Sequence, residues 1–309
     1  MNKKPVYIDT DMGLGTPGAE IDDGAALIAL LRCEKIQSKG IGSVFGNVPL
    51  TDAVANLNRL ITLMERKEIP LGKGAEVPLE AKMDWFSEWK QGYEKTLPWE
   101  TALPDDTSAD LLTRLIKESQ TPITVLSIGP MTNIATALSQ APEITELVRE
   151  VVVMGGSFSE RESPPEFNLR CDPEAANAVL NAGWPLVIFG LEITRKVLFT
   201  REMFYSLKSS HPAVQLLKSS ADRWIDRVES MGWESGGCSL HDAAATAYIL
   251  DPSLFNTISA ISVKINLEDG PKKGSTTIVQ SSNEKTKIRV AVDVDASSCR
   301  DLIWSLIDQ

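Results

Sequence analysis

Short apolar runs and helical patterns alternate along most of this chain, and this alternation constrains the fold more than any other feature. Strand-like runs cover residues 6–9, 41–46, 123–129, 148–156 and 184–190. Helical patterns lie between them, from about residue 22, over 52–65, from 131 and over 174–183. This order is typical of a mainly parallel sheet flanked by helices, because each crossover connection returns over one face of the sheet. We therefore predict an α/β fold.

The last third of the chain continues the pattern with less regularity. It holds helical stretches near 200–208, 211–230 and 240–250, strand-like stretches over 258–266, 277–280 and 287–295, and a final helix over about 297–308. No repeat, low-complexity tract or linker interrupts the sequence, so we predict a single domain over residues 1–309. Residues 75–107 are the least regular and most aromatic part, and we expect them to elaborate the rim of that domain.

The charge balance excludes several classes of partner. The 309 residues contain 31 Lys and Arg against 42 Asp and Glu, a formal net charge of −11. Such a surface repels phosphate backbones and anionic lipid, so we expect no nucleic acid and no membrane as a partner. The 4 cysteines are widely spaced without a C-x-x-C pair, which argues against a disulfide framework. With no long apolar run and no signal-like start, we expect a cytoplasmic protein.

Four aspartates gather where the first strand ends. Asp9 and Asp11 close that strand, and Asp22 and Asp23 open the following helix. Each one alone could cap a turn or favour the positive end of a helix. Together, at the edge where doubly wound sheets place their sites, they would repel one another unless a cation compensated them. Oxygen ligands suit a hard divalent cation, so the cluster predicts a metal site.

The loop between the two acid pairs also spells a dinucleotide-binding fingerprint, G-x-G-x-x-G, from Gly13 to Gly18. That motif requires a helix to begin at its third glycine and an acid after the second strand, and the sequence offers neither. The strand also ends in acids that would face a pyrophosphate. We therefore reject a dinucleotide site.

Further polar residues follow the other strands. They are Gly46-Asn47, Gly129-Pro130, Glu166 and Asn168 near the paired glycines of 155–156, and His241-Asp242 at the start of an apolar helix. If their segment is extended, Glu166 and Asn168 lie on one side, where a carboxylate and an amide suit sugar hydroxyls, or they are simply turn residues. The His-Asp pair offers a proton donor and a further hard ligand.

In this order the motifs resemble the nucleoside hydrolase family, the inosine-uridine-preferring N-ribohydrolases. The matching segments are DTDMG with IDDGA, VFGNVPL, LSIGPMTNIATAL, VVVMGG, EFNLRCDPEAA and HDAAATAYIL, across roughly residues 5 to 250. The resemblance implies a Rossmann-like core of the nucleoside hydrolase type, assembled as a homodimer or homotetramer. It also implies the activity of the family, hydrolysis of the N-glycosidic bond of ribonucleosides to ribose and free base.

The same resemblance implies roles for individual residues. It implies one Ca²⁺ held by Asp11, Asp23, Asp242 and the carbonyl of Ile128, with Asp9 behind them to orient the ligands. Ribose hydroxyls would be held by a second set of residues, Asp22, Asn47, Glu166 and Asn168. His241 would assist the leaving base, and its presence favours the pyrimidine or mixed-specificity members over purine specialists, which rely on stacking by tryptophan.

The chemistry of the bond agrees with these residue types. Cleavage passes through an oxocarbenium-like ribosyl cation, so the site needs a nucleophilic water, nearby negative charge and help for the leaving group. Ca²⁺ lowers the pKa of a bound water only moderately, so a carboxylate base is still required, and Asp11 is our candidate. Asp11 and His241 are therefore the predicted catalytic residues.

The chain departs from the family pattern in three places. Ten residues, MGLGTPGAEI, stand between Asp11 and Asp22, where the family has about three, and the insertion brings Glu20 near the site. The histidine motif H-G-x-x-G-L expected around 80–95 is missing, and SERESPP replaces an asparagine that often precedes E-F-N. A Gly-rich insertion can bulge while leaving both acid pairs in place, because longer loops cost little closure entropy.

Two other functions are compatible with parts of the sequence. Asp9-Thr10-Asp11 also fits the D-x-D of haloacid-dehalogenase-type phosphatases, although Gly13 stands where that family has Thr or Val. A non-catalytic nucleoside- or Ca²⁺-binding protein would also keep the acidic cluster. Trp224 and Trp233 could stack on a base or pack in the core.

Overall fold

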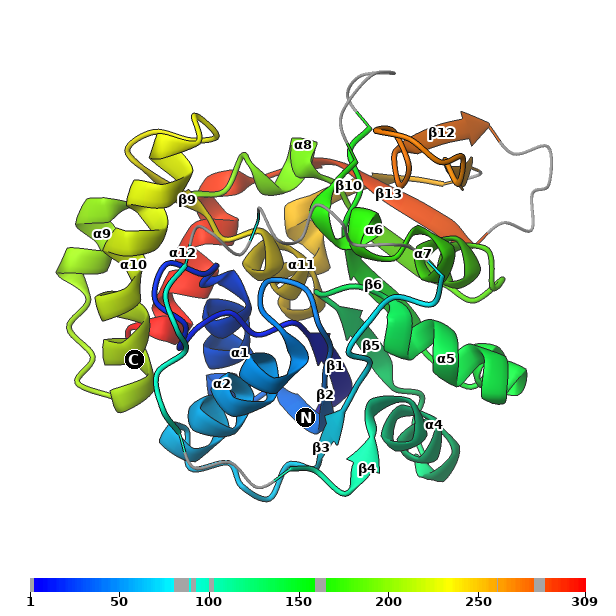
Figure 1. The fold of residues 1–309 in the computed structure, drawn as a ribbon, viewed down its shortest axis with the longest axis horizontal. Helices are drawn as coiled ribbons and strands as arrows, with labels where there is room; N and C mark the ends of the chain where they lie inside the picture. The colour runs from blue at the N-terminus through cyan, green and yellow to red at the C-terminus, as the bar shows by residue number, and fades with distance from the viewer. Residues whose placement is uncertain are drawn as a thin grey trace.

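The computed structural model describes residues 3–80, 89, 93–99, 103–158, 165–259, 261–280 and 287–309, and its centre is a twisted sheet (Figure 1). In that part of the chain the sheet has nine strands, in the order β10-β13-β7-β6-β5-β1-β2-β3-β4. All neighbouring pairs are parallel except β10 with β13. The predicted α/β class is confirmed.

The strands of the main sheet are short. They are β1 (Lys4–Thr10), β2 (Ile36–Ser43), β3 (Leu71–Lys73), β4 (Asp106–Thr107), β5 (Thr124–Ser127), β6 (Glu150–Met154), β7 (Leu186–Phe189), β10 (Phe255–Ile258) and β13 (Ile288–Val294). Two antiparallel pairs lie outside the sheet, β8 (Leu198–Thr200) with β9 (Gly237–Ser239), and β11 (Ile261–Ile265) with β12 (Thr276–Gln280).

Helices cover both faces of the sheet (Figure 1). They are α1 (Asp22–Arg32), α2 (Leu50–Leu63), α4 (Ser108–Glu118), α5 (Thr132–Gln140), α6 (Phe167–Cys171), α7 (Pro173–Leu180), α8 (Leu191–Thr194), α9 (Arg201–Ser206), α10 (Pro212–Ser230), α11 (His241–Leu250) and α12 (Ala296–Ile307). Short 3-10 helices cover Pro142–Glu146 and Pro252–Leu254. No helix among the described residues is long and apolar enough to cross a membrane.

The core is split by the sheet, as the alternation of side chains along β1 requires. Val6 and Ile8 belong to the cluster that packs α1 and α10 to α12, whereas Tyr7 belongs to the cluster that packs α4, α5 and α7. Because both faces are covered, the central strands are apolar without a break, and polar residues occur where those strands end.

The strand order places a switch point beside β1. From β1 the chain moves outward through β2, β3 and β4, and it then returns to β5 on the other side of β1. Crossovers leave this point in opposite directions, which opens a crevice at the carboxyl ends of β1 and β5. Asp9 pairs in register with Ser127, so the residues that follow each strand face one another there.

The structure differs from the sequence expectations in several places, which include the short strands β3 and β4 and the helix α6, none of them predicted. The single strand expected over 258–266 is divided between β10 and β11, which belong to different sheets. Helix α4 was missed, although Thr107 caps it by accepting from the Asp110 amide at 3.1 Å and its apolar face is regular. The short pair β8–β9 was also missed. Trp85 and Phe86 of the aromatic segment lie outside the described residues.

Candidate active site

The carboxylate of Asp9 lies at the end of β1 and is fully buried. The Asn133 side-chain amide donates to both of its oxygens, at 3.2 and 3.1 Å, and the Tyr7 hydroxyl donates to Oδ2 at 3.4 Å. Burial raises the pKa of Asp9 to about 7, against the opposing effect of these hydrogen bonds. Asp9 is thus held rigidly behind the edge of the sheet, by an asparagine from the start of α5.

Asp22 and Asp23 occupy the first turn of α1, where the partial positive charge of a helix N-terminus favours carboxylates. Asp23 accepts from the Thr10 hydroxyl and, at 3.0 Å, from the Asn47 side-chain amide. Burial, followed by the charge of Asp23, raises the pKa of Asp22 well above its usual range. The first turn of α1 thus presents two desolvated carboxylates to the crevice.

Asp242 comes to the same place from the start of α11, more than two hundred residues later in the chain. Asp22, Asp23 and Asp242 each offer a carboxylate oxygen, and these atoms all lie within 4.8 Å of one another. Burial and the charges of Asp22 and Asp23 raise the pKa of Asp242 well above its usual range. Three buried carboxylates at this distance fit a hard divalent cation, which would remove their mutual repulsion.

Asp11 lies directly after β1 and completes this acidic group. The Asn47 backbone amide donates to its Oδ2 at 2.6 Å, whereas its Oδ1 is buried without a hydrogen-bond partner among the described residues. Burial, then Asp23, raises its pKa well above the usual range. Gly46 permits this approach, because a Cβ there would lie 1.9 Å from Asp11 Oδ2. An orphaned carboxylate oxygen of this kind is what a bound cation or a water would satisfy.

Glu166 and Asn168 form a second wall beside the ends of β5 and β6, but their segment is not extended. Glu166 caps α6, accepting from the amides of Gly156, Asn168 and Leu169 at 3.1, 2.9 and 3.2 Å. Burial raises the pKa of Glu166 to about 7 despite these bonds. The Asn168 side-chain amide donates to the carbonyls of Ile128 and Met154, at 3.4 and 3.3 Å. The predicted pair therefore shares the wall through a helix turn and not through strand alternation.

His241 begins α11 and directly precedes Asp242. Its Nδ1 lies 2.7 Å from the hydroxyl of the buried Thr194, at the end of α8. Burial, followed by the charge of Arg195, lowers the pKa of His241 to about 3. The imidazole is therefore neutral near neutral pH, and its ring is fixed through Nδ1, so Nε2 is the nitrogen left to meet a ligand.

The inserted loop returns to the site instead of projecting from it. Gly13 and Glu20, near the two ends of the loop, lie against each other: a Cβ on Gly13 would lie 2.4 Å from the Glu20 carbonyl oxygen. Burial and the charges of Asp22 and Asp23 raise the pKa of Glu20 well above its usual range. The expectation that the insertion would bring Glu20 near the acids is confirmed. The bulge leaves both acid pairs in place because its two ends touch.

The structure also adds residues that the sequence analysis did not select. Asn133, Thr10 and Thr194 fix the side chains of Asp9, Asp23 and His241 respectively. Asn133 stands in the GPMTNIATAL segment and Thr10 stands inside D-T-D, so the motifs contained a signal for both. Thr194 had no signal, because its contact with His241 depends on how α8 packs against α11.

Comparison with known proteins gives a consistent answer across the whole chain. Residues 6–301 match the sequence model of a family described as inosine-uridine preferring nucleoside hydrolase. The pyrimidine-specific ribonucleoside hydrolase RihA of Escherichia coli O1:K1 is 29% identical over 308 residues, covering 97% of this chain and 96% of the relative. RihA of Shigella boydii serotype 4 is also 29% identical, over 310 residues with the same coverage.

Solved structures of similar proteins have the same fold. A purine-preferring ribonucleoside hydrolase from Gardnerella vaginalis superimposes with a TM-score of 0.86 at 26% identity, covering 99% of this chain and 98% of the other. A plant nucleoside hydrolase, PpNRh1, gives a TM-score of 0.84 at 24% identity over 99% of both chains, which supports the fold alone. The similarity in fold thus extends over nearly the whole chain.

Proposed function

The chain belongs to the inosine-uridine-preferring nucleoside hydrolase family, and on that premise we propose that it hydrolyses ribonucleosides with Ca²⁺ bound at the carboxyl end of β1. As a member of this family it is a hydrolase that acts on N-glycosyl bonds. Ribose and a free base are the products.

One observation supports this assignment of the site more than any other. The carboxylates of Asp22, Asp23 and Asp242 converge within 4.8 Å, and Asp11 Oδ1 is buried beside them without a partner. Asp11, Asp23, Asp242 and the Ile128 carbonyl are our proposed ligands, with Asp9 orienting them from behind. A hard divalent cation bound there would offset the negative charge and lower the pKa of an adjacent water.

Two side chains act on opposite partners of C1′: Asp11 acts on the attacking water, and His241 acts on the departing base. Asp11 takes a proton from the attacking water, whose oxygen forms a bond to C1′ as the bond from C1′ to the base nitrogen breaks. The surrounding carboxylates favour the positive charge that develops on the ribosyl group. His241, neutral and with its ring fixed through Nδ1 by Thr194, assists the departing base by donating a hydrogen bond from Nε2.

Ribose is held between the two walls of the crevice. Asp22 and Asn47 line the side of β1 and α1, and Glu166 and Asn168 line the opposite side. The three backbone amides that bind Glu166 fix its position: Oε2 accepts from Gly156 and Leu169, whereas Oε1 accepts from Asn168 alone and retains a lone pair for a hydroxyl. Because Asn47 and Glu166 are already held by hydrogen bonds, we expect little ordering entropy to be lost at these two side chains on binding.

For the leaving base we propose pyrimidines, alone or with purines. His241 supports this preference, as does the similarity to the hydrolases whose description is pyrimidine-specific. The purine-preferring relative from Gardnerella vaginalis is the reason to keep the mixed possibility. Trp224 is 2% exposed and packs in the core, while Trp233 is 50% exposed and remains available to a ligand.

We further propose the molecular context that the resemblance implies. Residues 1–309 would form a single domain, because β1 and β13 from opposite ends of the chain lie in the same sheet. The protein would be a homodimer or homotetramer in the cytoplasm, with free cysteines at 33, 171, 238 and 299. Sedimentation equilibrium of the purified protein would measure the assembly state.

Removal of the metal tests the proposed function directly. We expect the purified protein to release free base from uridine or cytidine, to release p-nitrophenol from p-nitrophenyl riboside, and to lose this activity in EDTA. Activity should return with Ca²⁺, because a bound cation would offset the repulsion between the converging carboxylates and hold them in the arrangement that binds the riboside. Intact ribosides under all conditions, with nucleoside still bound, would instead identify a binding protein. Phosphate released from p-nitrophenyl phosphate would indicate the phosphatase alternative.

Replacement of His241 tests how the base leaves. We expect His241→Ala to lower kcat for uridine by about 100- to 1,000-fold and for p-nitrophenyl riboside by less than about tenfold, because p-nitrophenolate leaves without a proton. His211→Ala is the control: it removes the only other histidine, which caps α10 through the Ala213 amide, and it should leave the ratio of the two rates unchanged. Equal losses on both substrates in His241→Ala would refute assistance to the leaving group.

A further inference from the structure

The inserted loop is a folded element of its own. Four of its apolar side chains are buried, namely Met12, Leu14, Ala19 and Ile21. Asn56 of α2 fixes its interior by donating to the carbonyls of Met12 and Gly13, at 3.1 and 3.3 Å, and to the Thr16 hydroxyl at 3.0 Å. Gly15 leaves room for this asparagine, because a Cβ there would lie 2.3 Å from Asn56 Oδ1. The loop therefore has one defined conformation.

This loop packs against residues 93–99, the described end of the aromatic segment. The Glu94 amide donates to the Pro17 carbonyl at 2.9 Å, and the Leu97 amide donates to the Gly15 carbonyl at 3.3 Å. The hydroxyls of Thr16 and Thr96 are 2.7 Å apart. Two of the departures from the family pattern, the insertion and the divergent region, thus form one structural unit.

Arg227 of α10 joins both parts of this unit. Its guanidinium donates to the Gly18 carbonyl at 2.9 Å and to the Trp89 carbonyl at 2.7 Å. It also lies 4.7 Å from the centroid of the Trp89 ring. Burial lowers the pKa of Arg227, while the charge of Glu20 acts in the opposite direction. A planar group that bridges two carbonyls and stacks on an aromatic ring fixes both partners in position.

Trp89 connects this unit to residues of the proposed active site. Its indole N–H donates to the Asn47 carbonyl at 3.3 Å, and its ring lies 4.6 Å from that of Phe167, the residue between Glu166 and Asn168. On its other side Trp89 stacks with Trp233 at 5.8 Å and 17°. Trp89 thereby touches both walls of the proposed ribose site.

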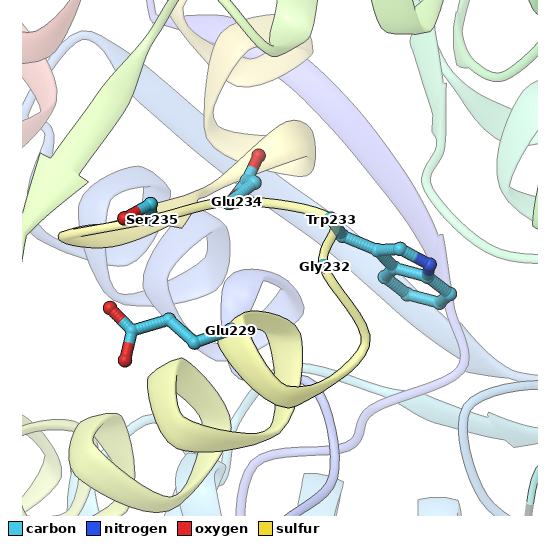
Figure 2. A pocket seen from close by; sticks show the side chains of 5 residues that line it. All are labelled: Glu229, Gly232, Trp233, Glu234 and Ser235. Atoms are coloured by element: carbon cyan, nitrogen blue, oxygen red, sulfur yellow. The ribbon is translucent and has the colours of Figure 1, made fainter.

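Trp233 marks where this unit meets solvent. It lies in the loop after α10 and lines a surface pocket with Glu229, Gly232, Glu234 and Ser235. Figure 2 shows its ring pointing away from Glu229 and from the end of α10. Trp233 is thus half exposed, whereas Trp89 contacts Phe167 and Arg227.

We propose that Arg227 is a positioning residue for ribose binding: it locks the inserted loop and Trp89 together and so fixes the two walls that hold the sugar. This inference rests on the proposed function. Arg227 contacts Trp89 and acts through it on Asn47 and Phe167. Its loss should therefore weaken binding of every riboside alike, in contrast with the loss of His241.

Kinetics of Arg227→Met and Arg227→Lys test this role. We expect KM to rise about 10- to 30-fold in Arg227→Met, for uridine and p-nitrophenyl riboside equally, with kcat within about threefold, since two hydrogen bonds to a charged donor are lost. Arg227→Lys should recover little, because lysine keeps the charge but lacks the planar fork. Arg223→Met is the matched control, one turn earlier on α10, where Arg223 makes an exposed pair with Glu94 at 2.7 Å.

A second measurement reports on the clamp without any turnover. Amide hydrogen exchange at Leu97 should become faster in Arg227→Met and stay unchanged in Arg223→Met, because the Leu97 amide bonds the clamped loop, whereas Arg223 pairs with Glu94 and not with Leu97. Kinetics and exchange in Arg227→Met that match Arg223→Met would overturn the proposal, as would a KM effect confined to one leaving group. If Arg227→Met does not fold, the Lys variant decides by the same two measurements. A wild-type protein inactive on all ribosides would contradict the proposed function, and the exchange data would still decide on the clamp.

Discussion

Replacing Asp11 by alanine should abolish riboside hydrolysis, with kcat falling by about 1,000-fold or more for uridine and p-nitrophenyl riboside alike. One oxygen of the Asp11 carboxylate is buried without a hydrogen-bond partner, while the Asn47 amide holds the other oxygen at 2.6 Å. Among the carboxylate oxygens of the described site, Asp11 Oδ1 is the one that is buried without any hydrogen-bond partner. Without it the attacking water has no proton acceptor, whatever the leaving group is.

Asp11→Asn separates the effect of losing the general base from the effect of losing the volume of the side chain. The amide fills the same space but accepts no proton, so we expect a loss of activity almost as large as in Asp11→Ala, with the fold retained by circular dichroism. Asp293→Ala is the control, since Asp293 pairs with Lys196 on the surface and both side chains are exposed. An Asp11→Asn protein with more than about a tenth of wild-type kcat would rule out Asp11 as the base.

Replacing Asp242 by alanine should remove metal binding. Wild-type protein should gain about 2.7 kcal/mol of unfolding free energy at a Ca²⁺ concentration 100-fold above Kd, because the ion binds the folded state alone. Asp242→Ala takes away one of the three converging carboxylates and should lose this gain together with the activity. Thermal unfolding with and without Ca²⁺, monitored beside uridine hydrolysis, measures both effects.

The metal-free form of the same variant gives an independent check. Asp242 is buried beside Asp22 and Asp23, and these carboxylates repel one another when no cation is present. Asp242→Asn should therefore unfold at a higher temperature than the wild type in EDTA, and at a lower temperature than the wild type in Ca²⁺. A Ca²⁺-dependent rise in Tm that persists in both Asp242 variants would contradict the ligand role of Asp242.

Two of the departures from the family pattern, the insertion after Asp11 and the divergent aromatic region, contact each other in the structure. In the sequence, the insertion after Asp11 and the divergent aromatic region look like separate sources of doubt about the site. In the structure, hydrogen bonds from Glu94 and Leu97 to the insertion join them, and Arg227 fixes both. The histidine motif expected at 80–95 falls largely outside the described residues, as does most of SERESPP. The acids themselves are undisturbed.

Local patterns in the sequence determined the α/β class and the order of the motifs. The alternation of apolar runs with helical periodicity is a property of neighbouring residues, and it predicts elements such as β1 and α1 correctly. It also predicts that Asp9, Asp11, Asp22 and Asp23 lie together. Asp9 and Asp11 stand where the first strand ends, Asp22 and Asp23 stand where the next helix begins, and sites in such folds lie at the carboxyl ends of the strands. The family resemblance depends on residues of this kind.

Tertiary structure alone decided which of these groups meet. Asp242 reaches Asp22 and Asp23 because α11 packs on α1, and Arg227 reaches Gly18 across 209 residues of sequence. Likewise Glu166 is fixed as a helix cap and not as a strand residue. Local periodicity specifies the type of an element and the face of a side chain, whereas the distance between two side chains depends on strand order, register and helix packing. Those are properties of the whole fold, and the site exists only when they are satisfied together.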